Sequence, residues 1–337
     1  MNTSVSSIPS SSNQIGALRY LLACSIVVHH VNSLSGSQWP VWIDPYTVVS
    51  LFFMLSGYFG WVSWLRRPHF REFVVHRLRR LLPAYWAVVL LGAIGLVSVS
   101  SLSPGVYFTS PQWWRYVGAN LALLNFLEPT LPGVFSQHLV TAVNPALWFV
   151  KLEVLFTFLL PLLAHAWKRL MGEHPTYWRA SFARGLCWGL GGACVIILLL
   201  GETQVLPLPA VGLRYLGYLQ HYLWGVALYF LLPRIRLTGT VGCGLLVLFL
   251  LSSWSAPFAH TVGWLVVLAL VLRLFLSDGP LRCLNRSNLS YSIYLSHCPL
   301  VQLALVWSLP DWGVWLMAFS SLGVAYGLYR GVERRWA

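Results

Sequence analysis

The sequence is poor in charged residues. Charged side chains make up only 9% of the 337 residues, whereas 57% are apolar, and the mean hydropathy is +0.67. A soluble domain carries about 25% charged residues, so this chain cannot cover a water-facing surface. A soluble enzyme, a fibre and a disordered chain are therefore excluded. Apolar runs of the length found here are typical of helices that cross a bilayer, and we expect a membrane protein.

Acidic residues are particularly scarce. Nine Asp and Glu stand against 22 Lys and Arg, which gives a formal net charge of +13. An excess of this size can indicate nucleic-acid binding, but the basic residues lie in short loops between apolar runs rather than on one helix face or in a tail. We therefore attribute the charge to membrane topology and expect no nucleic-acid partner.

The chain also lacks the patterns of disulfide frameworks, zinc sites and repeats. Its six cysteines form no CxxC pair, so we expect no metal. No repeat of fixed period is present, and the Ser-rich start is the only low-complexity tract. The first apolar run is too long for a removable signal peptide. We expect a polar tail over 1–14 and a single transmembrane domain over 15–337.

Apolar runs bounded by Arg, Pro and Gly divide the chain into possible membrane spans. There are eleven: Ile15–Leu34, Val48–Trp64, Pro83–Leu102, Tyr116–Leu127, Trp148–Trp167, Ala183–Leu200, Tyr215–Leu232, Thr240–Trp254, Val262–Leu276, Leu289–Trp307 and Trp312–Tyr329. A helix needs about 20 residues to cross the hydrocarbon core, so Tyr116–Leu127 is too short.

The distribution of Lys and Arg gives the orientation of the spans. If Tyr116–Leu127 does not cross the membrane, eighteen of the 22 basic residues fall in cytoplasmic loops, as the positive-inside rule requires. The sequence therefore predicts an all-α, polytopic transmembrane helical bundle with about ten spans and both termini cytoplasmic. The outer segment Ser103–Leu147 is expected to be non-spanning or re-entrant. It is either an interfacial aromatic belt or a lid over an acceptor-binding surface.

A few ionisable groups lie within the predicted spans, where each costs several kcal/mol unless it has a function. They are Arg19, His29, His30, Lys151, Glu153 and His297. Arg19 and His30 are eleven residues apart, which places them on nearly one helix face about 16 Å apart, with His29 rotated by about 100°. Lys151 lies on a different helix face from Glu153 and is expected to snorkel or to pair elsewhere.

His30 and Glu153 are expected at matching depth. His30 lies in the outer half of the first span, and Glu153 follows Trp148, the expected outer end of the fifth span, by five residues, or about 8 Å. A carboxylate beside an imidazole fixes its tautomer and raises its basicity, so the pair predicts a general base or nucleophile. The alternative is a structural hydrogen bond that joins two helices.

Arg77 and Arg80 lie three residues apart before the third span, on one helix face at the cytoplasmic boundary. Two guanidinium groups there are suited to bind the phosphates of an anionic donor. Retention of basic residues in the cytoplasm explains the same cluster without a ligand.

Five blocks in order resemble the acyltransferase-3 family over essentially the whole chain. They are LRYLLACSIVVHH with Arg19 and His30, FFMLSGY from Phe52 to Tyr58, RLRRLLPAYW with Arg77 and Arg80, LWFVKLEVLF with Glu153, and SYSIYLSHCP from Ser290 to Pro299. The resemblance implies an enzyme of the bacterial inner membrane that moves an acyl group, usually acetyl, from cytoplasmic acyl-CoA to a hydroxyl of an extracytoplasmic acceptor, usually a carbohydrate.

The resemblance also implies roles for individual residues. His30 and Glu153 are the expected catalytic residues, and Arg19, Arg77 and Arg80 are expected to bind acetyl-CoA. The substrate channel is expected to contain Ser56, Gly57, Tyr294 and His297. The chain departs from many relatives at Phe149 and Val154, where they carry polar and acidic residues. It also lacks the carboxy-terminal hydrolase-like domain of some relatives, so we expect direct delivery of the acyl group or delivery to a separate partner.

Two other classes of protein remain open. A secondary transporter also uses intramembrane His, Glu and Lys, but no second copy of the Arg19 and His30 block or of FFMLSGY is present. A structural subunit of a polysaccharide assembly machinery predicts that these ionisable residues are dispensable. Among acceptors, we expect exopolysaccharide, O-antigen or a lipid-linked precursor first, and a small hydroxylated molecule such as a macrolide second.

Overall fold

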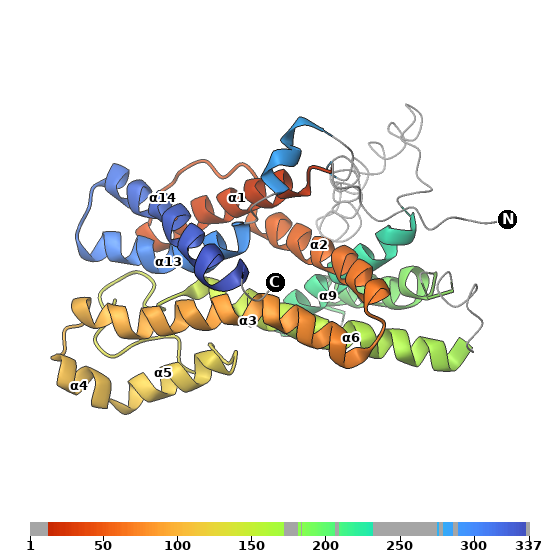
Figure 1. The fold of residues 1–337 in the computed structure, drawn as a ribbon, viewed down its shortest axis with the longest axis horizontal. Coiled ribbons are helices and arrows are strands. Elements are labelled where there is room, and N and C mark those ends of the chain that lie inside the picture. Colours follow the sequence, from red (N-terminus) through yellow and green to blue (C-terminus); the bar gives the residue numbers. More distant parts are fainter. Residues whose placement is uncertain are drawn as a thin grey trace. The chain divides into compact units, whose positions relative to one another are not determined.

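The computed structural model describes residues 13–171, 181–182, 184–205, 209–231, 275, 279–285 and 289–334 (Figure 1). In these residues the chain is helical and contains no β-strand, which confirms the all-α fold. The helices are α1 (Ile15–Ser35), α2 (Pro45–Arg66), α3 (Phe70–Gly95), η1 (Leu96–Val99), α4 (Pro104–Thr109), α5 (Pro111–Leu121), η2 (Pro145–Leu147), α6 (Trp148–Met171), η3 (Gly185–Gly191), α8 (Gly192–Glu202), α9 (Ala210–Leu231), η6 (Pro280–Asn285), α13 (Ser290–Val306), α14 (Asp311–Leu328) and η7 (Tyr329–Glu333).

Four of the described segments are long and apolar enough to cross a membrane: Ile15–Ser35, Pro45–Arg66, Phe70–Val99 and Pro145–Leu170. Three of them coincide within a few residues with the predicted spans Ile15–Leu34, Val48–Trp64 and Trp148–Trp167, whereas Phe70–Val99 overlaps the predicted Pro83–Leu102 but begins at Phe70 rather than Pro83. Thr240–Trp254 lies outside the described residues, as does nearly all of Val262–Leu276. The count of ten spans and the cytoplasmic position of both termini therefore stay predictions.

The chain forms two compact units, each assembled from separate stretches. The first comprises Met1–Leu18, Tyr46–Phe73 and Phe156–Arg286. The second comprises Arg19–Pro45, Val74–Leu155 and Ser287–Ala337. The second unit therefore contains all six ionisable residues that the sequence analysis singled out within spans. Whether 15–337 behaves as one domain stays a prediction.

In the first unit, α2 and α9 approach closely through two glycines. A Cβ atom on Gly57 would overlap the carbonyl oxygen of Tyr222, and a Cβ on Gly225 would overlap that of Met54. Small residues at a helix crossing allow backbones to approach closely, which is how helices associate in lipid. The glycine of the FFMLSGY block is therefore fixed by helix packing.

In the second unit, the short helix α5 packs antiparallel to the second half of α3 (Figure 1). The Tyr85 hydroxyl donates to the Asn120 carbonyl over 2.8 Å, and the Trp113 indole N–H donates to the Ala93 carbonyl over 2.9 Å. Pro111 opens α5 at a position that needs no backbone N–H. The helix ends after 11 residues, or about 16 Å, so the Tyr116–Leu127 run does not span, as the sequence predicts.

The stretch 138–144, which has no regular secondary structure, lies along α13 in the same unit. The Gln302 amide N–H groups donate to the carbonyls of Val140 and Ala142 over 2.7 and 3.1 Å, and its Oε1 lies 2.6 Å from Nδ1 of His138. Backbone without regular structure is tolerated at membrane depth only where protein groups satisfy its polar atoms. These bonds meet that requirement beside a predicted span, and the re-entrant position of this part of the outer segment stays a prediction.

The start of α6 follows from this stretch. The Asn144 side chain donates to the Leu295 carbonyl over 2.8 Å and accepts from the Ala146 N–H over 3.2 Å, which caps η2. The Tyr294 hydroxyl donates to the Ala146 carbonyl. α6 therefore begins near the level of Tyr294, in the first third of α13, rather than beside the far end of that helix.

Candidate functional site

Three arginines from two helices converge in the second unit. Arg19 on α1 lies within electrostatic range of Arg77 and Arg80 on α3. The three-residue spacing of the α3 pair places both on one face, as the sequence predicts. We refer to Arg19, Arg77, Arg80, Glu153 and Glu333 together as the arginine cluster.

Glu153 belongs to the arginine cluster. Its Oε2 lies 3.5 Å from Nη2 of Arg77, and the two side chains are only 7% and 11% exposed. Arg19 and Arg80 also interact electrostatically with this carboxylate. A buried charge is costly unless it is paired, and this ion pair meets that requirement for Arg77.

The expected pairing of His30 with Glu153 is wrong. It assumed that the fifth span begins at the outer membrane boundary, so that Glu153 would lie only about 8 Å below it. The irregular stretch 138–144 and η2 instead carry the chain inward along α13 before α6 starts, and five residues of α6 then bring Glu153 to the level of Arg77.

Glu333 is a member of the cluster that sequence reasoning missed. It lies in the π-helical segment η7 and accepts a hydrogen bond from the Ser292 hydroxyl. Burial raises the pKa of its carboxyl, and this effect outweighs the hydroxyl and the Arg80 guanidinium, which lower it. An acidic residue between Arg330 and Arg334 was the available signal.

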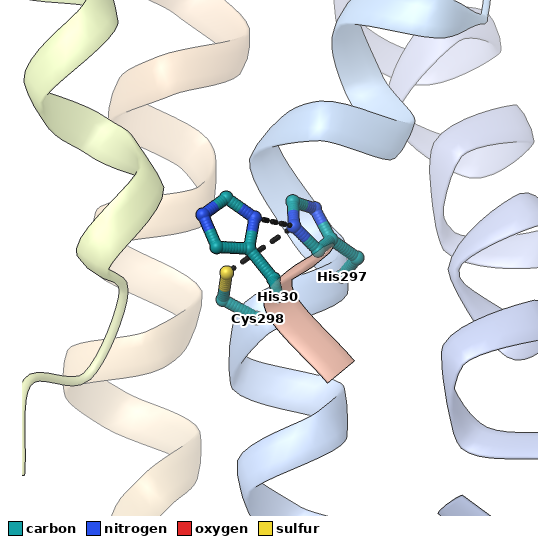
Figure 2. A group of neighbouring side chains, drawn as sticks. All are labelled: His30, His297 and Cys298. Atoms are coloured by element: carbon teal, nitrogen blue, oxygen red, sulfur yellow. Dashed lines mark hydrogen bonds between the residues drawn. The ribbon is translucent and has the colours of Figure 1, made fainter. Parts of the chain in front are cut away.

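A second cluster contains His30, His297 and Cys298, which we refer to as the histidine cluster (Figure 2). Nδ1 of His30 lies 2.7 Å from Nε2 of His297, and Sγ of Cys298 lies 3.2 Å from the same nitrogen. His297 and Cys298 are both 0% exposed, whereas His30 is half-buried. The least buried residue of this cluster is therefore His30.

Two of the remaining residues expected in the channel, Tyr294 and Gly57, lie against the backbone of neighbouring helices. Tyr294 is 7% exposed and is bonded to the backbone of η2. Ser56 and Gly57 lie on α2 in the first unit, where Gly57 meets the backbone of α9. Their roles in a substrate channel stay predictions. Lys151 places its ammonium 4.6 Å from the centroid of the Phe126 ring. This contact is away from Glu153, in line with the expectation that Lys151 snorkels or pairs elsewhere.

The two clusters occupy different levels of α1. Arg19 contributes to the arginine cluster and His30 to the histidine cluster, so eleven residues, or about 16 Å of helix rise, separate them. The arginine cluster has the donors and the positive charge to hold a phosphorylated ligand. The histidine cluster has an imidazole that can accept a proton at a distance from that charge.

Comparison with known proteins identifies the family of the chain. The acyltransferase-3 family, described as an acyltransferase domain, matches residues 12–330. Nodulation protein 10 of Rhizobium leguminosarum bv. viciae is 24% identical over 338 residues, which cover 90% of this chain and 87% of that protein. No solved structure matches the chain. Because the family match covers nearly all of the sequence, the chain belongs to the acyltransferase-3 family and is a membrane acyltransferase.

Proposed function

We propose that this protein is an O-acetyltransferase of the bacterial inner membrane. It takes the acetyl group of cytoplasmic acetyl-CoA and transfers it to a hydroxyl of an extracytoplasmic carbohydrate, such as exopolysaccharide, O-antigen or a lipid-linked precursor. The protein then works beside the polysaccharide assembly machinery, and its apolar helices contact the lipid bilayer.

The single observation that carries this proposal is the separation of the arginine and histidine clusters along α1. Coenzyme A carries its phosphates at one end of a long flexible arm and the acyl thioester at the other. A site for this donor needs a cationic group at one level and a proton acceptor at another. Arg19 and His30 supply these two groups about 16 Å apart on one helix.

His30 acts as the general base in this proposal. It takes the proton of the acceptor hydroxyl as the oxygen attacks the thioester carbonyl, and an oxygen–carbon bond forms. The carbon–sulfur bond of the donor then breaks, and the coenzyme A thiolate leaves with the proton that His30 returns. No electrons are exchanged with a further reagent, so donor and acceptor alone balance the reaction.

The arginines bind the donor. A guanidinium group offers a planar fork of N–H donors that matches two phosphate oxygens, and a charge-assisted bond of this kind is about twice as strong as a neutral one. Glu153 holds the Arg77 guanidinium through their ion pair. In this proposal Glu153 acts through Arg77 on the donor, in place of the expected action on His30.

Exposed aromatic residues support a carbohydrate acceptor. Trp42, after α1, is 73% exposed, and Trp114 on α5 is 63% exposed. Aromatic faces stack against the apolar faces of sugar rings, and tryptophan also anchors proteins at membrane interfaces. Trp114 lies in the outer segment Ser103–Leu147, so acceptor binding there also fits the interpretation of that segment as a lid over the acceptor.

Acetyl transfer by the purified protein tests the proposal. The wild-type protein in liposomes should release coenzyme A thiol from acetyl-CoA only when a hydroxylated sugar acceptor is present, and the acceptor should gain an ester. The variant Arg77→Ala/Arg80→Ala should need far more acetyl-CoA for the same rate. Transport of the sugar without thiol release would contradict an acyltransferase and favour a transporter.

A further inference from the structure

The hydrogen bonds of His297 define which of its nitrogens carries a proton. Its Nδ1 lies 3.0 Å from the backbone carbonyl of Ile293, one turn earlier on α13. A carbonyl oxygen can only accept, so Nδ1 of His297 is the donor and carries the hydrogen. In the neutral ring, Nε2 is then left with its lone pair, which faces both Nδ1 of His30 and the Cys298 thiol.

The same logic extends to His30. Nδ1 of His30 lies 2.7 Å from Nε2 of His297, so that contact is a hydrogen bond in which the His30 nitrogen donates. A neutral His30 that carries its proton on Nδ1 has its lone pair on Nε2. The base atom of His30 is thereby the nitrogen that points away from the His297 ring (Figure 2).

We propose that His297 is a positioning residue that holds His30 in the Nδ1–H tautomer, so that His30 Nε2 is the atom that accepts the proton of the acceptor hydroxyl. The Ile293 carbonyl fixes the tautomer of His297, and Nε2 of His297 in turn fixes the tautomer of His30. This inference rests on the proposed function only in assigning His30 as the base. It replaces the carboxylate that usually orients a catalytic histidine with a second, neutral imidazole.

Burial distinguishes the roles of the two rings. His297 is 0% exposed and is held on both nitrogens, so it has no nitrogen left for a substrate. His30 is half-buried and has one nitrogen outside the pair. His297 therefore acts through His30 and does not contact the acceptor itself.

The distances favour a hydrogen-bonded pair over a metal site. The donor atoms of His30, His297 and Cys298 all lie within 4.8 Å of one another, which is close enough to consider an ion. Two nitrogens that share a tetrahedral zinc at about 2.0 to 2.1 Å lie about 3.3 Å apart. The 2.7 Å between the two imidazole nitrogens is a hydrogen-bond length instead.

Matched substitutions of His297 test the proposal through activity. His297→Leu removes the acceptor, so kcat should fall about 10- to 100-fold while the KM for acetyl-CoA changes little, because the arginine cluster is untouched. His297→Gln places an amide oxygen near the position of Nε2 and should recover most of kcat. Equal losses of kcat in the Gln and Leu variants would overturn the positioning role. A loss of activity that comes from a higher KM for acetyl-CoA would overturn it as well.

Cys298→Ala tests the competing use of the buried thiol. The proposal gives the thiol no chemical step, so Cys298→Ala should lower kcat less than the about 10- to 100-fold loss expected for His297→Leu. Loss of acetyl transfer in a correctly inserted Cys298→Ala protein, with kcat retained in His297→Leu, would assign the function to the thiol and overturn the proposal.

A spectroscopic measurement separates this inference from the proposed function. In protein labelled with ¹⁵N-histidine in bilayers, the His30 signals are identified by their loss in His30→Gln. They should show a protonated Nδ1 and an unprotonated Nε2 in wild type and a mixture in His297→Leu. A protonated Nε2 in wild-type protein overturns the proposal whether or not acetyl transfer is observed. Absence of transfer with the expected tautomer refutes only the proposed function.

Discussion

Nη2 of Arg77 lies 3.5 Å from Oε2 of Glu153, and this ion pair joins α3 to α6 in a region where both side chains are almost fully buried. Its position ties the acidic residue of the LWFVKLEVLF block to the arginines instead of to the histidine. A buried pair of this kind is costly to break from one side, because the remaining charge is left without its partner.

Glu153→Gln should therefore act on the donor side of the reaction. The amide keeps the shape but loses the charge that holds Arg77, so the KM for acetyl-CoA should rise and the protein should lose roughly 3–5 kcal/mol of stability. Donor titrations and thermal unfolding in detergent measure both effects. A lower kcat with an unchanged donor KM and an unchanged unfolding temperature would instead indicate that Glu153 acts on His30.

Arg77 and Arg80 should contribute to donor affinity beyond their charge. Arg77→Lys keeps the charge but loses the planar fork, so it should weaken acetyl-CoA binding, and Arg80→Ala should weaken it further. Calorimetry with the purified protein measures the affinity. Arg79→Ala is the matched control, because Arg79 is exposed on the same helix and lies outside the arginine cluster. Similar losses in the Arg79 and Arg80 variants would refute specific phosphate binding.

Gly57→Ala should destabilise the protein for a steric reason. The added Cβ would overlap the Tyr222 carbonyl, so α2 and α9 must move apart, at a cost of about 1–3 kcal/mol or more. Gly323→Ala on α14 is the control, because its Cβ meets no atom within 4 Å and alanine is the better helix former. Thermal unfolding should rank Gly57→Ala lowest. Equal unfolding temperatures would contradict the helix contact.

Single cysteines at positions 71 and 137 should be labelled from opposite sides of the membrane. Arg71 and Gln137 are both exposed, so burial does not limit either reaction. In a cysteine-free background, an impermeant reagent added to intact cells should reach position 137 and not position 71, because the basic residues then lie in the cytoplasm. The reverse pattern would invert the topology.

Composition and charge were enough to predict the class of fold and the first spans. The scarcity of charged residues predicts membrane helices, and the bounds of α1, α2 and α6 lie within a few residues of the apolar runs. The short run at Tyr116–Leu127 was also correctly excluded, because length alone limits what can cross a bilayer.

Depth within the bundle could not be predicted in the same way. The sequence locates Glu153 relative to Trp148 but does not reveal that the irregular stretch 138–144 carries Trp148 inward along α13. That stretch depends on contacts such as Gln302 with Val140, which are distant in sequence. The position of Glu333 beside Ser292 depends on the return of the chain end to α13. It could not be predicted either, because this contact also joins residues that are distant in sequence.

Acetyl transfer by His30→Ala and His29→Ala in the same liposomes tests the central claim most directly. The two rings are neighbours on α1, with centroids 5.4 Å apart, but the imidazole pair with His297 includes His30. Loss of the general base should lower kcat about 100- to 10,000-fold in His30→Ala, whereas His29→Ala should transfer acetyl groups at close to the wild-type rate. If His29→Ala abolished transfer while equally well inserted His30→Ala kept wild-type turnover, His30 would not be the base and the account would be wrong.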